Sequence, residues 1–282
     1  MKTNRKMLKN RNLIMRPLKF SLLLMIVLSN TACRQKSNLG LILAGSTSVQ
    51  PFAETLSEAY MVLHSEITID VQGGGSSAGI MSAQTDTADI GMSSRNLKDD
   101  EVGLWSVEIA KDGLAVIVHS KNTVQNLTLS QVRDIYAGVI TNWKELGGRD
   151  AKIHVITREE GSGTRSAFEG LLMDKIEIDP RSIVQDSNGT VRQLVGDDIN
   201  AIGYISLGLV NEKVKALKLE GIAATRENVI NGTYILSRPY LFVLKSEPVG
   251  EVKQFIDFCL SDEGRALLDA EGLITTDKGG AQ

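Results

Sequence analysis

The sequence predicts an α/β protein, and three observations support this prediction. Short apolar runs alternate with helical patterns from Leu41 onward, as expected where strands and helices alternate along a chain. Clusters of glycine, serine and threonine separate several of these runs from the helical pattern that follows, as turns between a strand and a helix require. The chain has 282 residues, of which 42% are hydrophobic and 23% charged, so it can bury a substantial core.

The first 32 residues differ from the rest of the chain. They contain seven basic side chains and no acidic one. The apolar run from Phe20 to Leu28 is much shorter than the ~20 residues that a membrane-spanning helix needs. Small residues then lead to Cys33. A basic region, a short apolar core and small residues in this order are typical of a bacterial export signal, so we expect residues 1–32 to be a signal peptide.

The two cysteines lie in different contexts. The end of the leader resembles a lipoprotein signal, which predicts lipidation of Cys33, a tether at 33–38 and a cell-membrane lipoprotein that faces the extracellular side or the periplasm. Asn30 stands where such signals usually carry an aliphatic residue, and ordinary cleavage after Ala32 is the alternative; both place the mature chain outside the cytoplasm. Cys259 lies in a helix-like segment and is expected to be a buried free thiol.

The net charge also differs between residues 1–32 and the rest of the chain. The whole sequence carries a formal charge of −3, but without the leader 24 basic and 34 acidic residues remain, a net charge of −10. A surface this acidic argues against nucleic acid or anionic lipid as the main partner of the folded part. Any anion that this protein binds must therefore be held by local hydrogen-bond donors.

The predicted strands and helices follow one another without an internal repeat or a low-complexity linker. The predicted strands cover residues 41–44, 67–71, 88–92, 114–118, 152–156, 201–205 and 240–244. Helices are predicted from Phe52 to Leu63 and from Thr128 to Ala137, and Thr128 with Gln131 forms a capping box at the start of the second. Because no flexible linker appears, two domains would have to be joined by strands, for which LAVIVHS and RPYLFVLKS are the candidates.

Three loops between strands and helices carry the candidate chemistry: GSTS at 45–48, GGGSSAG at 73–79 and GSGT at 161–164. Glycine lets the backbone approach a ligand, the hydroxyl groups donate hydrogen bonds, and the first N–H groups of the next helix point to the same place. Three such loops around one cleft predict an oxyanion site. The alternative for each single loop is that its serine or threonine only caps the following helix.

Two arginines lie close to these loops. Arg158 precedes the third loop, and Arg95 follows Ser94 at the end of a predicted strand. An arginine binds a tetrahedral oxyanion through two parallel N–H bonds, and a nearby carboxylate such as that of Glu160 orients it. The alternative is a solvated surface pair of Arg158 with Glu160.

The segments LAGSTSVQPFAE, VQGGGSSAGI, ADIGMSSR, LTLSQVRDIYAGVITNWKELGG, REEGSGTR and AIGYIS together resemble the phosphate-binding proteins of bacterial high-affinity phosphate ABC transporters. They occur in the order of that family from Leu43 to Ser206, and the segment to Ile274 fits its returning first domain. The resemblance implies a type 2 periplasmic-binding-protein fold with two α/β lobes, two crossover strands and a ligand in the cleft. Lobe 1 would comprise 39–118 and 239–282, and lobe 2 would comprise 119–238.

The resemblance also implies a function and a site. The protein would be a monomeric, non-enzymatic receptor without cofactor or metal, which captures inorganic phosphate and delivers it to the permease of an ABC transporter. The implied phosphate-binding residues are Thr47, Ser48, Ser76, Ser77, Ser94, Arg95, Arg158, Glu160, Ser162, Gly163 and Thr164. Glu160 would stand where many members carry an aspartate paired with the arginine. Ser94 stands where well-known members carry an aspartate that accepts the proton of hydrogen phosphate.

Two other functions remain open at this point. The first is a binding protein for another tetrahedral oxyanion such as sulfate, an alternative that arises because Ser94 replaces the usual acceptor. The sequence from Gly75 to Gly79 also matches the G-x-S-x-G motif of α/β-hydrolases, with Ser77 as nucleophile and His119 or His154 as its base. ATP hydrolysis and zinc catalysis lack their motifs in this sequence.

Overall fold

In the computed structural model, residues 39–275 are described. The predicted signal peptide at 1–32, the tether at 33–38 and the lipidation of Cys33 lie outside the described residues, as does the end of predicted lobe 1 at 276–282. None of the helices within 39–275 is both long and apolar enough to cross a membrane.

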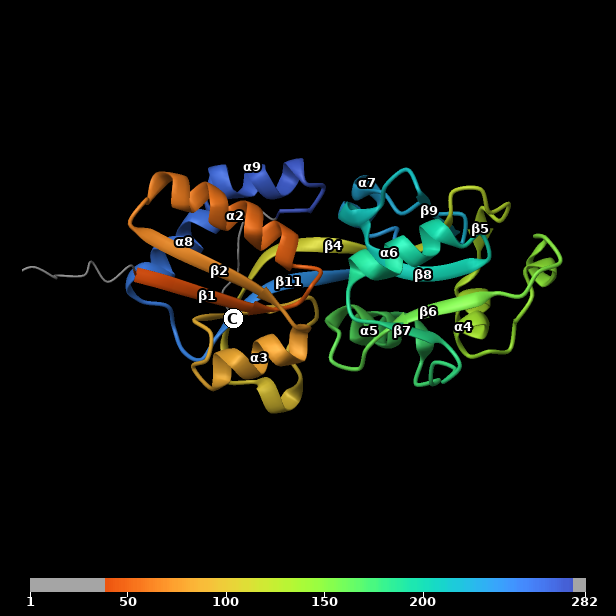
Figure 1. Cartoon of the computed structure of the whole chain (residues 1–282), viewed down its shortest axis with the longest axis horizontal. Coiled ribbons are helices and arrows are strands. Elements are labelled where there is room, and N and C mark those ends of the chain that lie inside the picture. Colours follow the sequence, from red (N-terminus) through yellow and green to blue (C-terminus); the bar gives the residue numbers. More distant parts are fainter. Residues whose placement is uncertain (1–38, 276–282) are drawn as a thin grey trace, which may run out of the picture. The chain divides into compact units, whose positions relative to one another are not determined.

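A nine-stranded sheet runs through the described part of the chain, in the order β2-β1-β3-β11-β4-β8-β6-β7, with β9 paired to β4 (Figure 1). Its strands are β1 (Leu39–Gly45), β2 (Ile67–Gly73), β3 (Ile90–Ser93), β4 (Trp105–His119), β6 (His154–Arg158), β7 (Ile183–Gln185), β8 (Ala201–Ser206), β9 (Val214–Ala216) and β11 (Ser237–Leu244). The short strands β5 (Asn126–Leu127) and β10 (Lys218–Leu219) pair separately. β1 pairs in parallel with β2 and β3, whereas β11 runs antiparallel to both β3 and β4.

The helices cover both faces of this sheet. The α-helices are α2 (Gln50–Leu63), α3 (Ser76–Gln84), α4 (Leu129–Tyr136), α5 (Gly163–Phe168), α6 (Asn188–Asp197), α7 (Arg226–Ile230), α8 (Gly250–Leu260) and α9 (Asp262–Ala270). The short helical turns are η1 (Asp99–Glu101), η2 (Trp143–Leu146), η3 (Glu169–Met173) and η4 (Leu207–Leu209). In Figure 1, α2, α8 and α9 lie on one side of β1 and β2, and α3 lies on the other.

The elements form two lobes with separate hydrophobic cores. One core contains Phe52 of α2, Tyr240 of β11 and Phe255 of α8, and it defines lobe 1. The main core of the other elements contains Tyr136 and Trp143 and defines lobe 2. The predicted division between lobes, after residue 118 and before residue 239, stays a prediction.

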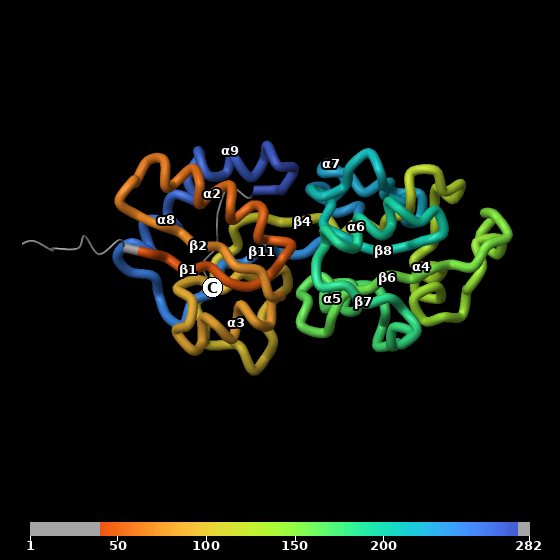
Figure 2. Tube along the Cα trace, in the orientation of Figure 1, coloured from red at the N-terminus to blue at the C-terminus, as the bar shows by residue number. Residues whose placement is uncertain are grey.

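Strands β4 and β11 join the two lobes, and Figure 2 shows the trace passing along both. The first part of β4 pairs with β11, from Leu244↔Trp105 to Ser237↔Gly113. Its second part, from Leu114 onward, pairs with β8. Ala110 belongs to the core of lobe 1, and Leu114 belongs to that of lobe 2, so the chain passes from one core to the other within a single strand. The structure therefore has the two-lobed α/β architecture with two crossover strands that the sequence predicts.

All of the predicted strands and helices are present. Each of the seven predicted strands overlaps an observed one, and both predicted helices are found as α2 and α4. Thr128 caps α4 as expected, because its hydroxyl accepts from the backbone N–H of Gln131 and the Gln131 side chain accepts from the backbone N–H of Thr128. β5, β7, β9 and β10 were not predicted; each has only two or three residues, too few for a recognisable alternation.

Candidate functional site between the lobes

The three predicted loops all connect a strand to a helix, and they meet between the lobes. The first lies between β1 and α2, the second between β2 and α3, and the third between β6 and α5. The hydroxyl oxygens of Ser48 and Thr164 are 2.7 Å apart. The Ser76 hydroxyl lies 3.3 Å from that of Ser94 and accepts from the Ser94 backbone N–H at 3.0 Å. All four residues are buried, so the loops form one enclosed hydroxyl cluster.

Helix capping explains only one of these loops. The cap positions of α2 and α3 are Val49 and Gly75, and neither helix receives a side-chain cap. Ser162 does cap α5, because its hydroxyl accepts from the backbone N–H of Arg165 at 3.2 Å. The hydroxyls of Ser48 and Ser76 therefore face the cluster without a capping role.

Two glycines allow the loops to approach one another. Gly75 has a φ of +89°, and a Cβ there would come within 2.9 Å of the Gly161 carbonyl oxygen from the other lobe. A Cβ at Gly163 would overlap the hydroxyl oxygens of Ser76 and Ser94. Because a side chain would occupy this space, the closed arrangement requires glycine at both positions.

Arg158 lies at the end of β6 with its side chain only 1% exposed. Its Nε and Nη2 donate to the two carboxylate oxygens of Glu159, each at 2.9 Å, and Nη2 also donates to the Thr47 hydroxyl at 3.1 Å. Its Nη1 is buried and has no hydrogen-bond partner within 39–275. The guanidinium is therefore fixed by one carboxylate against the first loop and retains an unused donor.

The predicted pairing of Arg158 with Glu160 is wrong. Glu159 is the partner, because it directly follows the strand and its side chain returns to the guanidinium. Glu160 lies in the turn that follows and is exposed. The wider expectation that a carboxylate orients Arg158 is confirmed, with the partner shifted by one residue.

Arg95 is also buried but carries a different pairing. Its Nη1 and Nη2 donate to the Glu101 carboxylate at 2.7 and 2.8 Å, and Nη2 lies 3.3 Å from the Ser77 hydroxyl. These hydrogen bonds lower the pKa of the Glu101 carboxyl from its ordinary value of 4.5. The charge of Arg95 is therefore matched by Glu101 on the side of the cluster where Ser77 lies.

The structure adds residues that sequence reasoning missed. Ser46 donates to the Ser94 hydroxyl at 2.9 Å, and Asn188 of α6 donates to the Ser48 hydroxyl at 3.0 Å. Arg238 of β11 contacts Ser94 from the crossover region and is paired with Asp112 of β4. Ser46 lies within the GSTS loop, whose composition already indicates donor residues. Asp112 and Arg238 are brought together by strand pairing, and Asn188 reaches Ser48 because the lobes meet.

The hydrolase arrangement is absent from the described residues. Neither candidate histidine contacts Ser77: the His154 Nδ1 lies 2.5 Å from an Asp198 carboxylate oxygen, and the His119 Nδ1 accepts from the Lys121 backbone N–H. Ser77 lies in the first turn of α3 and its hydroxyl contacts Arg95. Residues 39–275 also contain no group of three or more His, Cys, Asp or Glu side chains arranged to hold a metal ion.

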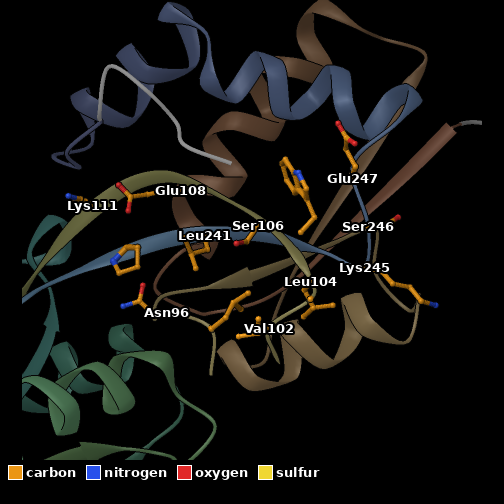
Figure 3. A pocket seen from close by; sticks show the side chains of 14 residues that line it. Asn96, Val102, Leu104, Ser106, Glu108, Lys111, Leu241, Lys245, Ser246 and Glu247 are labelled. Carbon is orange, nitrogen blue, oxygen red and sulfur yellow. The ribbon is translucent and has the colours of Figure 1, made fainter. Parts of the chain in front are cut away.

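A large cavity of about 920 Å³ lies elsewhere, in lobe 1 (Figure 3). Leu104, Ser106 and Glu108 line it from β4 and the turn before it, and Leu241 lines it from β11. None of the predicted site residues lines this cavity. The hydroxyl cluster is tightly closed, so the size of a cavity does not identify the site in this molecule.

Two lobes joined by two crossover strands, with donor loops from both lobes meeting between them, define a substrate-binding protein of the type 2 periplasmic-binding class. The PBP superfamily domain matches residues 30–263. A phosphate-binding protein PstS of Bacillus subtilis is 31% identical over 250 residues, which cover 87% of this chain and 81% of the relative.

Two solved structures of phosphate-transport proteins are also similar to this chain. A crystal structure with bound phosphate, of a protein named as a phosphate ABC transporter substrate-binding protein from Clostridium perfringens, has 47% identity and a TM-score of 0.82, covering 84% of this chain and 100% of that one. An ABC-type phosphate transport receptor from Vibrio cholerae has 40% identity and a TM-score of 0.71, with coverages of 84% and 100%. The chain therefore belongs to the PBP superfamily and, within it, to the family of the PstS phosphate-binding proteins. The predicted fold and the predicted family are both confirmed.

Proposed function

We propose that this protein captures inorganic phosphate between its lobes and delivers it to the permease of an ABC transporter. The observation that carries the proposal is the geometry of Arg158. Its guanidinium is fully buried, anchored by Glu159 and in contact with Thr47 of the opposite lobe, and it keeps Nη1 free for a ligand. A buried donor without a partner is costly, and an anion in the hydroxyl cluster would satisfy it.

The bound anion replaces hydrogen bonds that the cluster now makes with itself. Hydroxyls of Ser48, Ser76 and Thr164 donate to the phosphate oxygens, together with Thr47 and Arg158. Gly163 provides the space in which the two lobes close on the ligand. Burial excludes water, and this strengthens each of the charge-assisted hydrogen bonds. The acidic surface repels an anion only weakly, because salt screens charges that are more than ~8 Å apart.

Phosphate and sulfate differ in protonation near neutral pH. Inorganic phosphate retains at least one proton there, because its last ionisation occurs only at strongly alkaline pH, whereas sulfate has no proton to donate. We assign the acceptor of this proton to the Ser94 hydroxyl, which lies at the centre of the cluster and is contacted by Ser46, Ser48 and Ser76. A hydroxyl accepts as well as donates, so this acceptor excludes sulfate less strongly than a carboxylate would.

The setting of the protein follows from the same proposal. The mature chain acts outside the cytoplasm as a monomer, with a lipid on Cys33 holding it to the membrane beside the permease. Its task is capture and release, without catalysis and without a metal or other cofactor. The relatives named as phosphate-binding proteins and as a phosphate transport receptor support this assignment.

Calorimetric titration of the purified mature protein with phosphate and with sulfate tests the proposal. We expect saturable binding of phosphate at micromolar concentrations and weaker binding of sulfate. The absence of saturable heat with either anion would overturn the proposal, and a preference for sulfate would reassign the ligand. Treatment with a serine-directed phosphonate tests the hydrolase alternative, for which we expect no labelling of Ser77.

A further inference from the structure

An arginine from the second crossover strand reaches the hydroxyl cluster. Arg238 of β11 and Asp112 of β4 are register partners, and their side chains are each only 1% exposed. The Arg238 Nε and Nη2 both donate to the Asp112 Oδ2, at 3.1 and 3.0 Å. Two of the three guanidinium nitrogens are therefore used to anchor the side chain.

The third nitrogen faces the predicted site. Arg238 Nη1 contacts the Ser94 hydroxyl at 3.4 Å, which is beyond the usual range of an N–H···O hydrogen bond. The same hydroxyl oxygen lies within 2.9 to 3.4 Å of those of Ser46, Ser48 and Ser76. The Nη1 of Arg238 is therefore a charged donor that lies close to the centre of the hydroxyl cluster and makes only a weak contact there.

The carboxylate behind Arg238 is held on all sides. The Asp112 Oδ1 accepts from the Ser206 hydroxyl at 2.7 Å, and its Oδ2 also accepts from the Tyr240 hydroxyl at 2.9 Å. Ser206 belongs to β8 of lobe 2, and Tyr240 belongs to the crossover strand β11. Both strands therefore fix the position of Asp112. A guanidinium anchored in this way loses little further conformational freedom when it binds an anion.

Arg238 also lines a cavity of about 360 Å³. Arg95, Lys98 and Arg238 line it, with Ser166 and Leu171 from lobe 2, and no aspartate or glutamate is among its lining residues. Arg95 and Arg238 are each paired with a carboxylate that does not line the cavity, Glu101 and Asp112 respectively. An anion in this cavity therefore meets cationic N–H donors and no carboxylate of the lining.

We propose that Arg238 is a second arginine ligand of the bound anion, positioned by Asp112 and approached through this cavity. The inference rests on the proposed phosphate function. It adds a ligand residue from the crossover strands to the ligand residues of the two lobes. Arg158 holds the anion from lobe 2 and Arg238 holds it from the crossover strands. Closure of the lobes then brings the two guanidinium groups onto one ligand, beside Ser94.

Three variants test this role by calorimetry with phosphate, with thermal unfolding measured in parallel. Arg238→Gln removes the charge but leaves Asp112 buried without its cation, which itself destabilises a protein. The double variant Arg238→Gln with Asp112→Asn removes both charges and keeps hydrogen-bonding groups at both positions. Arg238→Lys keeps the charge and loses the planar fork.

Arg226→Gln is the matched control. Arg226 of α7 pairs with Asp269 of α9 at 2.7 Å, so this variant also removes an ion pair between elements of the two lobes, but away from the hydroxyl cluster. It reports what the loss of an interlobe ion pair does to phosphate affinity when no proposed ligand is removed.

We expect wild type and Arg226→Gln to bind phosphate within about twofold of each other, and the double variant to bind at least about tenfold more weakly. We expect Arg238→Lys to recover part of the loss. A folded double variant that binds phosphate as wild type does would overturn the inference, as would a double variant that no longer folds, because Arg238 would then have a structural role. A wild-type protein that binds no phosphate would instead overturn the proposed function, and this inference with it.

Discussion

The hydroxyl groups of Ser48 and Thr164 are 2.7 Å apart, although the residues are 116 positions apart in the chain and belong to opposite lobes. Asn188 adds a donor to the same Ser48 oxygen at 3.0 Å. The two lobes therefore meet through hydroxyl groups that bond to one another. An entering anion must exchange these bonds for its own, so binding requires that the lobes separate and close again.

Gly163 provides a direct test of this closure. Gly163→Ala places a methyl group where the Ser76 and Ser94 hydroxyls lie, so we expect phosphate affinity to fall at least about tenfold, while the free energy of unfolding changes by less than about 1 kcal/mol. Gly161→Ala is the control two residues away, since a Cβ there meets nothing within 4 Å. Calorimetry and urea unfolding measure both effects, and equal affinities of the two variants would contradict the closed arrangement.

Arg158 is expected to contribute strongly to anion binding. Arg158→Ala removes a buried charged donor and should weaken phosphate binding by at least about 2 kcal/mol. Arg192→Ala is a suitable control, because the Arg192 guanidinium donates to the Leu209 carbonyl in lobe 2 and contacts no residue of the cluster. An Arg158→Ala protein with unchanged affinity would show that the anion lies elsewhere.

The pair of Arg95 with Glu101 should make stability depend on pH. The pKa of Glu101 is lowered in the folded state, so its contribution is fully present above the ordinary value of 4.5 and is lost as the pH falls through the lower folded value. At neutral pH we expect Glu101→Gln to reduce the free energy of unfolding by about 1 kcal/mol, since the pair is partly solvated. Urea unfolding of both proteins across the acidic range measures the difference.

That difference should shrink toward zero at the acidic end of the range. Asp100→Asn, one residue earlier and exposed, should follow wild type throughout. A difference between Glu101→Gln and wild type that stays constant with pH would show that the ion pair does not contribute to stability.

Cys259 should be protected in the native protein. Its thiol is fully buried in lobe 1, and burial raises its pKa well above the ordinary value, so little thiolate forms. The chain has two cysteines, so a Cys33→Ser variant leaves Cys259 as the sole thiol. We expect negligible reaction with a thiol reagent under native conditions and complete reaction in denaturant. Rapid labelling of the native protein would mean that the core of lobe 1 opens readily.

The sequence predicted the elements that have a clear period and the loops that have a distinctive composition. The GSTS, GGGSSAG and GSGT loops follow β1, β2 and β6 as expected, because glycine and hydroxyl residues mark such turns. Strand β4 is longer than the segment at 114–118 that the apolar pattern predicts, because it begins at Trp105. Polar residues such as Lys111 and Asp112 interrupt its apolar pattern.

Asp112 and Arg238 are not predicted from the sequence for one physical reason. Asp112 is polar and yet fully buried, and it is tolerated there because Arg238, Ser206 and Tyr240 surround it. These partners lie far along the chain, and only the pairing of β4 with β8 and β11 brings them together. Asn188 of α6 reaches Ser48 only because the two lobes meet. A pattern within one segment cannot reveal a contact that depends on the register between strands.

Equilibrium dialysis with radiolabelled phosphate tests the central claim most directly, because it measures both stoichiometry and competition at one site. We predict one phosphate per chain at saturation, displaced by unlabelled phosphate, displaced less readily by sulfate, and strongly reduced in Gly163→Ala and Arg158→Ala. No retained phosphate in the wild-type protein, or retention that both variants leave unchanged, would contradict the account of an anion held between the two lobes.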